Sequence, residues 1–345
     1  MRRPNDAPSS PLPEGEGQGE GFWSQRFRRK FATCILAAAA VITLLASPAF
    51  AGEEAFVSNQ NDDSVAIVDL DSMRVAAKIA IPGKPVGVAV SRDGRRAYVT
   101  SPDAKTLTVI DAEKRTAIKT IALKGGPFGV AVHPSGAPVY VTDWYENRLF
   151  VIDAEAGAIT GEIPVGLAPS GVAVSGDGRM IVTADRDSDQ VTLIDAASLK
   201  PAATVKVGAR PFGVTIDDAT GRVFTANVAS NSVSVVDMAA RQVLAEVKVG
   251  ERPYAVALGE GKAFVTDQYS GTLTAFDAAT YAVMGKIAVA EYPEGIAASA
   301  DGRFIYVANW FDNKFTKIDA ATLKILGLVE TGDGPRAFGT FIRRK

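Results

Sequence analysis

The sequence predicts an all-β fold, a seven-bladed β-propeller with four antiparallel strands in each blade. Two sets of residues that recur at a fixed spacing predict it. Steps of 42 residues, with one of 40, separate the aspartates Asp69, Asp111, Asp153, Asp195, Asp237, Asp277 and Asp319. The same steps separate the prolines Pro85, Pro127, Pro169, Pro211, Pro253, Pro293 and Pro335. A period of this length over residues 52–345 is typical of propeller blades.

Each period reads as four short strands joined by turns. In residues 85–123 the apolar stretch "PVGVAVS" is followed by "RRAYVTS", "TLTVIDA" and "AIKTIAL", which are rich in β-branched and aromatic residues. The connections "SRDGR", "SPDAK" and "DAEKR" contain the residues that favour turns. No segment of residues 52–345 keeps a long helical period, so the sequence predicts strands throughout.

The two ends of this repeat region complete each other. The region begins with "AFVSN", "SVAIVDL" and "VAAKIAI", which are the last three strands of a blade. It ends with "PRAFGTFI", residues 335–342, which reads as a first strand alone. We expect the C-terminal strand to join the N-terminal three, because closing the ring removes an open sheet edge.

Residues 1–51 have a different composition. We expect residues 1–25 to be a disordered leader, because they are rich in Pro, Gly, Ser and Glu. Residues 26–51 combine basic residues, an apolar run from Phe31 to Ala46 and a small-x-small site, which predicts a signal peptide cleaved after Ala51. An uncleaved anchor is the alternative. "RRKF" resembles a twin-arginine export signal, and the Sec route stays open. Either route predicts a periplasmic or secreted protein.

Composition limits the chemistry of the exported chain. Cys34, the sole cysteine, lies in the leader, so disulfides and thiolate metal sites are excluded after cleavage. Residues 1–51 hold six basic and four acidic side chains, which leaves residues 52–345 with a net charge of −4. This charge does not favour nucleic-acid binding. His133, the sole histidine, replaces Ser91 and Ser175 of other periods and is predicted to be a turn residue. We therefore predict no catalytic residue, no metal ligand and no cofactor, although a divalent cation or a quinone is not excluded.

The segments "AYVTS", "VYVTD", "VFTAN" and "IYVAN", each followed by a "VIDA"-like element, resemble the YVTN-repeat β-propeller family. With its signal peptide the chain resembles the periplasmic, YncE-like members. The resemblance covers residues 52–345. It implies the propeller architecture and says little about activity, because this repeat serves many functions. We expect a monomer with no transmembrane segment in the mature chain.

Residues present in every blade are interpreted as structural, so function is expected where the blades differ. We call top the face that carries the loops between second and third strands and the connections into first strands. These loops vary in sequence, whereas the turns of the opposite, bottom face are nearly uniform. The candidate ligand- or partner-binding residues of the top face are Trp144, Tyr145, Arg186, Arg210, Arg252, Tyr254, Tyr269, Trp310, Phe311 and Arg336. Such Trp, Tyr and Arg side chains are enriched at binding hot spots. The alternative is that the aromatic side chains pack between neighbouring blades.

A second candidate set is a polar ring. The residue that follows each "YVT"-like element is Asn59, Ser101, Asp143, Asp185, Asn227, Asp267 or Asn309. These residues are candidates for a ring at the channel mouth that holds a cation or polar ligand. The alternative is that they satisfy the backbone of the turns. The loop at Asp185, Asp187 and Asp189 does not fit an EF-hand, which needs Gly where Gln190 stands.

These observations favour a non-enzymatic periplasmic scaffold that binds a partner protein, peptide or small molecule on its top face. The first alternative is a periplasmic propeller enzyme, lactonase-like or resembling a quinone-dependent dehydrogenase. The shortage of histidine and cysteine argues against it. The second alternative is single-stranded nucleic-acid binding on the aromatic side chains, which the acidic charge disfavours.

Overall fold

The computed structural model describes residues 52–345, which lie in one compact unit. The leader expected at residues 1–25 and the signal peptide expected at residues 26–51 lie outside the described residues. Within the described part no helix is long and apolar enough to cross a membrane.

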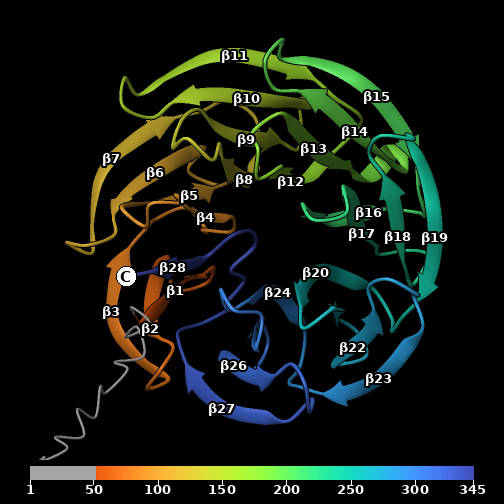
Figure 1. The fold of residues 1–345 in the computed structure, drawn as a ribbon. Helices are drawn as coiled ribbons and strands as arrows, with labels where there is room; N and C mark the ends of the chain where they lie inside the picture. Colours follow the sequence, from red (N-terminus) through yellow and green to blue (C-terminus); the bar gives the residue numbers. More distant parts are fainter. Residues whose placement is uncertain (1–51) are drawn as a thin grey trace, which may run out of the picture. The chain divides into compact units, whose positions relative to one another are not determined.

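Seven four-stranded antiparallel sheets form a ring around a common axis, as Figure 1 shows, and we call the region about this axis the channel. Blade 1 contains β1 (Glu53–Asn59), β2 (Ser64–Asp69), β3 (Arg74–Ala80) and the C-terminal β28 (Ile342–Arg344). Blade 2 contains β4 (Val88–Val90), β5 (Arg96–Ser101), β6 (Thr106–Asp111) and β7 (Thr116–Ala122). Blade 3 contains β8 (Pro127–Val132), β9 (Val139–Asp143), β10 (Arg148–Asp153) and β11 (Ala158–Pro164). Blade 4 contains β12 (Pro169–Val174), β13 (Met180–Asp185), β14 (Gln190–Asp195) and β15 (Lys200–Lys206), with a 3₁₀ turn at Arg186–Ser188.

The remaining three blades repeat this order. Blade 5 contains β16 (Pro211–Asp217), β17 (Arg222–Asn227), β18 (Ser232–Asp237) and β19 (Gln242–Lys248). Blade 6 contains β20 (Pro253–Gly259), β21 (Lys262–Asp267), β22 (Thr272–Asp277) and β23 (Val283–Ala288). Blade 7 contains β24 (Pro293–Ala298), β25 (Phe304–Asn309), β26 (Lys314–Asp319) and β27 (Ile325–Glu330). The predicted fold class, seven blades of four strands, is confirmed.

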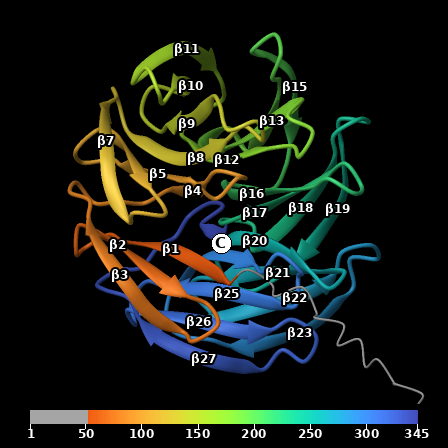
Figure 2. The same ribbon diagram turned by 60° about the vertical axis from the view of Figure 1, so that its left-hand side comes forward.

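Each blade runs radially, with its first strand beside the channel and its fourth strand on the rim (Figure 1, Figure 2). The burial of the strands follows this order. Second and third strands such as β5 and β6 are almost wholly buried, because blades cover both of their faces. Fourth strands such as β3 alternate between exposed and covered residues, because successive side chains point to opposite faces and only one of these faces is covered.

The C-terminal strand closes the ring, as expected. β28 pairs antiparallel with β1, with Ala55 opposite Ile342 and Glu53 opposite Arg344. The boundaries expected for this strand, residues 335–342, need correction, because the regular strand begins only at Ile342. Residues 335–341 bend where Ala337 and Gly339 have positive φ angles of 46° and 126°. This bend directs the segment between blades 1 and 2.

Glycines and hydroxyls bring neighbouring first strands together. A Cβ atom on Gly129 would lie 2.2 Å from the carbonyl oxygen of Ser170 in the next blade, so only glycine fits there. The Thr142 hydroxyl accepts the Gly129 amide and donates to the same Ser170 carbonyl, both at 2.8 Å. The recurrent Pro-x-Gly and "YVT" elements are therefore contacts within and between blades.

The recurrent aspartates are also structural. Each accepts a hydrogen bond from the backbone amide three residues later, in the turn between third and fourth strands. The donors, in chain order, are the amides of Ser72, Lys114, Ala156, Ser198, Ala240, Thr280 and Thr322. The prediction that these carboxylates organise their turns is confirmed. His133, in a bottom turn, hydrogen-bonds Ser135 and the Gly178 carbonyl, which agrees with its predicted turn role.

Candidate functional site on the top face

Aromatic side chains from several blades meet at the upper end of the channel. We call this group the throat cluster; its members are Phe128, Trp144, Phe212, Tyr254 and Phe338. Phe212 lies at its centre, with ring centroids 4.4 Å from Tyr254, 5.3 Å from Phe338 and 5.6 Å from Phe128. These residues belong to blades 1, 3, 5 and 6, several of which are not neighbours in the ring. Their mutual contact therefore spans the channel and closes it on this side.

A charged pair borders the throat cluster. The Arg336 guanidinium donates two hydrogen bonds to Glu294, from Nε to Oε2 at 2.5 Å and from Nη2 to Oε1 at 3.1 Å. Gln268 donates a third, of 2.7 Å, to Glu294 Oε1. The Tyr254 hydroxyl beside this pair is buried and has no hydrogen-bond partner within residues 52–345. Its burial raises the pKa of Tyr254 above the ordinary value. The throat thus combines an apolar wall with one bidentate ion pair.

A second aromatic group lies farther from the axis, on the top loops of blades 6 and 7. We call it the blade 6–7 patch; its members are Arg252, Tyr269, Tyr292, Trp310 and Phe311. The Arg252 guanidinium carbon lies 4.4 Å from the centroid of the Tyr269 ring, a cation–π contact. Tyr292 links the two blades, with centroids 5.4 Å from Tyr269 and 5.8 Å from Phe311. Tyr269 and Phe311 are 52% and 60% exposed, so their rings form an apolar surface in water.

The ten top-face candidates fall into these two groups, with two exceptions. Trp144, Tyr254 and Arg336 belong to or border the throat, and Arg186 joins them through a cation–π contact with Trp144. Arg252, Tyr269, Trp310 and Phe311 form most of the blade 6–7 patch. Tyr145, which is 71% exposed, and Arg210, whose Nε lies 3.9 Å from Asp187, stand outside both groups. Tyr254 is buried, as expected if the aromatic side chains pack between blades. Tyr145, Tyr269 and Phe311 are exposed, so this alternative does not apply to them.

The polar ring lies inside the blades. Its described members are fully buried, and most hydrogen-bond within their own blade. Asp185 accepts from Thr183 and Thr192, Asp143 from Gly126 and Arg148, and Asn227 donates to Ser232 and Ser234. The same holds for Asp267 with Gly250 and Thr274, and for Asn309 with Thr316. Asn59 reaches the carbonyl of Thr331. Asp143 and Asp267 thus accept backbone amides, whereas Asp185 and Asn227 bond mainly to neighbouring hydroxyl groups. Burial raises the pKa of Asp185 and Asp267.

Sequence reasoning did not find a cavity in the lower half of the channel. It measures about 460 Å³ and is lined by the first strands β8, β12, β16, β20 and β24 together with residues 338–342. Phe338 of the throat cluster closes its upper end. Its lining residues belong to the repeated "GVAV" segments, which read as buried strands. The small side chains of these segments are the one feature of the sequence that could have indicated a cavity between the first strands.

The ring and its loops define the class of protein, a seven-bladed β-propeller. Residues 49–138 match the model of a family described as YNCE-like beta-propeller. This match and the seven blades confirm the resemblance to YncE-like propellers. No curated protein matches the sequence.

Two solved structures show the same fold. One is Kuenenia stuttgartiensis hydrazine synthase, with a TM-score of 0.71 and 21% identity over 78% of this chain and 92% of that chain. The other is a functionally unknown protein from Desulfotomaculum acetoxidans, with a TM-score of 0.73 and 14% identity over 83% of this chain and 99% of that chain. At these identities the likeness concerns the fold alone.

Proposed function

We propose that this propeller is a non-enzymatic periplasmic scaffold that binds a partner protein on its top face, through the blade 6–7 patch. One observation carries the proposal. Among residues 52–345, the exposed aromatic side chains are Tyr145, Tyr269 and Phe311, and all three stand on top loops. The basic and apolar segments of residues 26–51 support the periplasmic location.

The patch has the composition of a binding hot spot. Aromatic rings and arginines supply a large contact area with little loss of side-chain entropy, and they dominate the energetics of many interfaces. Arg252 lies against Tyr269, and its buried Nε atom has no hydrogen-bond partner in the described part of the chain, residues 52–345. A partner that supplies a carbonyl or carboxylate oxygen would satisfy this donor while covering the rings of Tyr269 and Phe311.

The proposal is tested by photo-cross-linking in cells. A photoreactive phenylalanine is placed at Phe311, and the matched control places it at Tyr281, in a bottom turn of blade 6. We expect one discrete adduct from position 311 and none from position 281. The cross-linked protein is then identified and titrated against the purified propeller. Tyr269→Ala and Phe311→Ala should each weaken binding by about tenfold or more.

Two results would overturn the proposal. One is an equal pattern of adducts from positions 281 and 311. The other is a partner whose affinity is unchanged in the double variant Tyr269→Ala, Phe311→Ala. Circular dichroism of the variants checks that the exposed substitutions leave the fold intact.

A further inference from the structure

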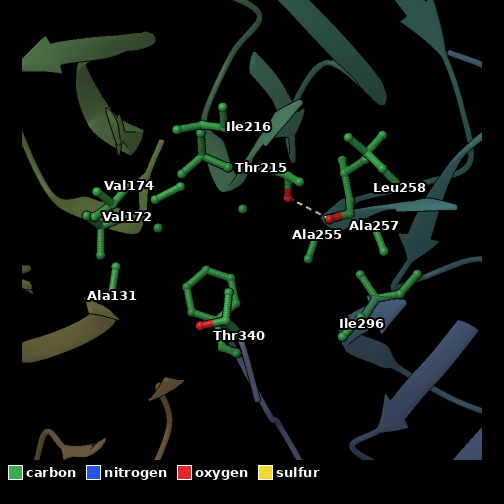
Figure 3. Close-up of a pocket in the computed structure, with 18 of the residues that line it drawn as sticks. Ala131, Val172, Val174, Thr215, Ile216, Ala255, Ala257, Leu258, Ile296 and Thr340 are labelled. Carbon is green, nitrogen blue, oxygen red and sulfur yellow. Dashed lines mark hydrogen bonds between the residues drawn. The ribbon is translucent and has the colours of Figure 1, made fainter. Parts of the chain in front are cut away.

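The lower channel cavity has an apolar wall and one open end. Its lining residues include Val172 and Val174 of β12, Ile216 of β16 and Ala298 of β24, several of which are labelled in Figure 3. Asp218, in the exposed turn after β16, lies at the lower end. The cavity therefore opens on the bottom face, opposite the blade 6–7 patch. Its volume is within the range of small-molecule sites, about 300–1,000 Å³.

The chain itself shows how the inner edge of a blade binds a peptide. In blade 2, the amides of Val88 and Val90 point away from β5, toward the channel. They donate to the carbonyl oxygens of Phe338 and Thr340, at 2.9 and 2.8 Å. The bridge between Gly87 and Phe338 is parallel. Residues 338–340 thus bind the free edge of β4 as an added strand does.

The first strands around the cavity present the same edge. Val172 and Val174 of β12 occupy the positions that Val88 and Val90 occupy in β4. The next residue also has the same hydrogen bond in both blades: the Ser175 amide donates to the Met180 carbonyl, as the Ser91 amide donates to the Arg96 carbonyl. Antiparallel pairing alternates, so the backbone groups of Val172 and Val174 point into the channel. In blade 6 the Val256 carbonyl shows this direction directly, because it accepts a 2.6 Å bond from Thr215 Oγ1, the dashed line in Figure 3.

Charge distinguishes the two ends of the cavity. The upper end is the aromatic ring of Phe338. At the lower end Asp218 uses Oδ1 to accept the Gly176 amide at 2.6 Å, and its Oδ2 accepts no hydrogen bond within residues 52–345. Arg92 reaches the neighbouring carbonyl of Gly176 at 3.4 Å. A ligand with an apolar body and a cationic end fits this polarity, with the cation at Asp218 and the apolar body against the channel wall.

We propose that the cavity is a second binding site, which takes a short peptide-like amine. The ammonium group pairs with Asp218, amide groups bond to the free edges of β12 and β16, and small apolar side chains fill the space below Phe338. A far end without charge is required, because the closed end offers no polar partner for a carboxylate. The site is independent of the top-face function.

The probe is valyl-alanine N-methylamide, which carries one ammonium, two amides and no carboxylate. Isothermal titration calorimetry of the full chain should show saturable binding at one site. Acetylation of the probe amine and Asp218→Asn should each weaken binding about tenfold, and the two together should add little, because both remove one ion pair. A probe methylated on its internal amide nitrogen should bind at least tenfold more weakly, because it loses an edge hydrogen bond.

Two variants that fill the cavity, Ala298→Phe and Val174→Phe, should abolish binding independently, so that a folding defect in one leaves the other as a test. Phe311→Ala, on the opposite face, should bind the probe as the unmodified protein does. The proposal is overturned by absence of saturable binding up to millimolar probe. It is also overturned if the acetylated or N-methylated probe binds equally well, or if a folded cavity-filling variant keeps its affinity. None of these outcomes bears on the partner of the top face.

Discussion

The guanidinium of Arg343 donates from Nη1 to Oε2 of Glu54 at 3.0 Å, joining two residues that are 289 positions apart in the sequence. Glu54 is fully buried, and Arg115 and Lys345 also contact its carboxylate. Arg343 further donates to the carbonyls of Gly94 and Ala112 in blade 2. This one carboxylate therefore connects the first strand of the ring, the last strand and the neighbouring blade.

Deletion of residues 335–345 should destabilise the propeller far more than the loss of eleven terminal residues normally does. It removes β28, leaves Glu54 buried without Arg343, and exposes the edges of β1 and β4. We expect the free energy of unfolding, measured in urea, to fall by more than about 5 kcal/mol, because the deletion combines the loss of a strand with a buried carboxylate that has lost Arg343 and Lys345. Lys345→Ala, which removes only the partly exposed ammonium group beside the same carboxylate, is the control and should cost much less than the deletion. An unchanged melting temperature in the deletion would contradict closure by β28.

The seven-bladed ring was predictable because the same sequence pattern recurs in every blade. The regularly spaced aspartates and prolines mark the same turn and the same strand start seven times, which is enough to predict the strand order and the closing strand. The bend at Ala337 and Gly339 occurs once and depends on contacts with blade 2, so the periodic pattern extended the closing strand too far. The top-face groups were partly predictable from residue type, but the split between throat and patch depends on side-chain directions that the sequence does not contain.

Thr142→Val should weaken the contact between blades 3 and 4. The hydroxyl bridges the Gly129 amide and the Ser170 carbonyl, and both of these groups are buried. Valine fills the same space and satisfies neither, so we expect a cost of about 1–3 kcal/mol in unfolding free energy. Thr160→Val is the matched control, because its hydroxyl makes one 3.1 Å bond on a fourth strand. Equal losses of unfolding free energy for the two substitutions would contradict the prediction that the hydroxyl bridge between blades stabilises more than a single hydrogen bond on a fourth strand.

Aspartates of the bottom turns should make the protein sensitive to acid. A hydrogen bond from Ser299, with help from Arg303, lowers the pKa of Asp301 to about 2, below its ordinary value of 3.8. A carboxyl group with a lower pKa in the folded state stabilises above the unfolded pKa, and this contribution is lost as the pH falls from about 4 to about 2. Asp301→Asn should therefore lower the melting temperature at pH 7, and the deficit should shrink over this range. Glu113→Gln, on an exposed turn, is the control and should show no such trend.

Asp185→Asn should have the opposite effect. Burial raises the pKa of Asp185, so the ionised carboxylate costs stability at neutral pH, and that cost disappears as the pH falls below the folded pKa. Blades 1, 5 and 7 carry asparagine at this position, which shows that the amide fits. We expect a higher melting temperature at pH 7 and a shrinking gain in acid. Asp143→Asn is the contrast, because Arg148 pairs with that carboxylate at 3.0 Å, and the substitution should destabilise. A loss of stability at pH 7 in both variants would refute the distinction.

Glu294→Gln should destabilise the closure of the ring at the throat. Arg336 belongs to the C-terminal segment, and its side chain is 18% exposed beside the Glu294 side chain, which is 2% exposed. Removal of the carboxylate charge leaves a largely buried cation unpaired, which costs about 3 kcal/mol in comparable pairs. Arg336→Gln alone should also destabilise. The double variant should recover part of the lost stability, because neither charge of this pair is then left buried without its partner. Urea unfolding of the unmodified protein, the two single variants and the double variant gives the coupling energy between Glu294 and Arg336.

If the losses of unfolding free energy in the single variants simply add in the double variant, the ion pair contributes little. The aromatic packing of Phe338 against Phe212 and Tyr254 would then be what holds the C-terminal segment in the channel.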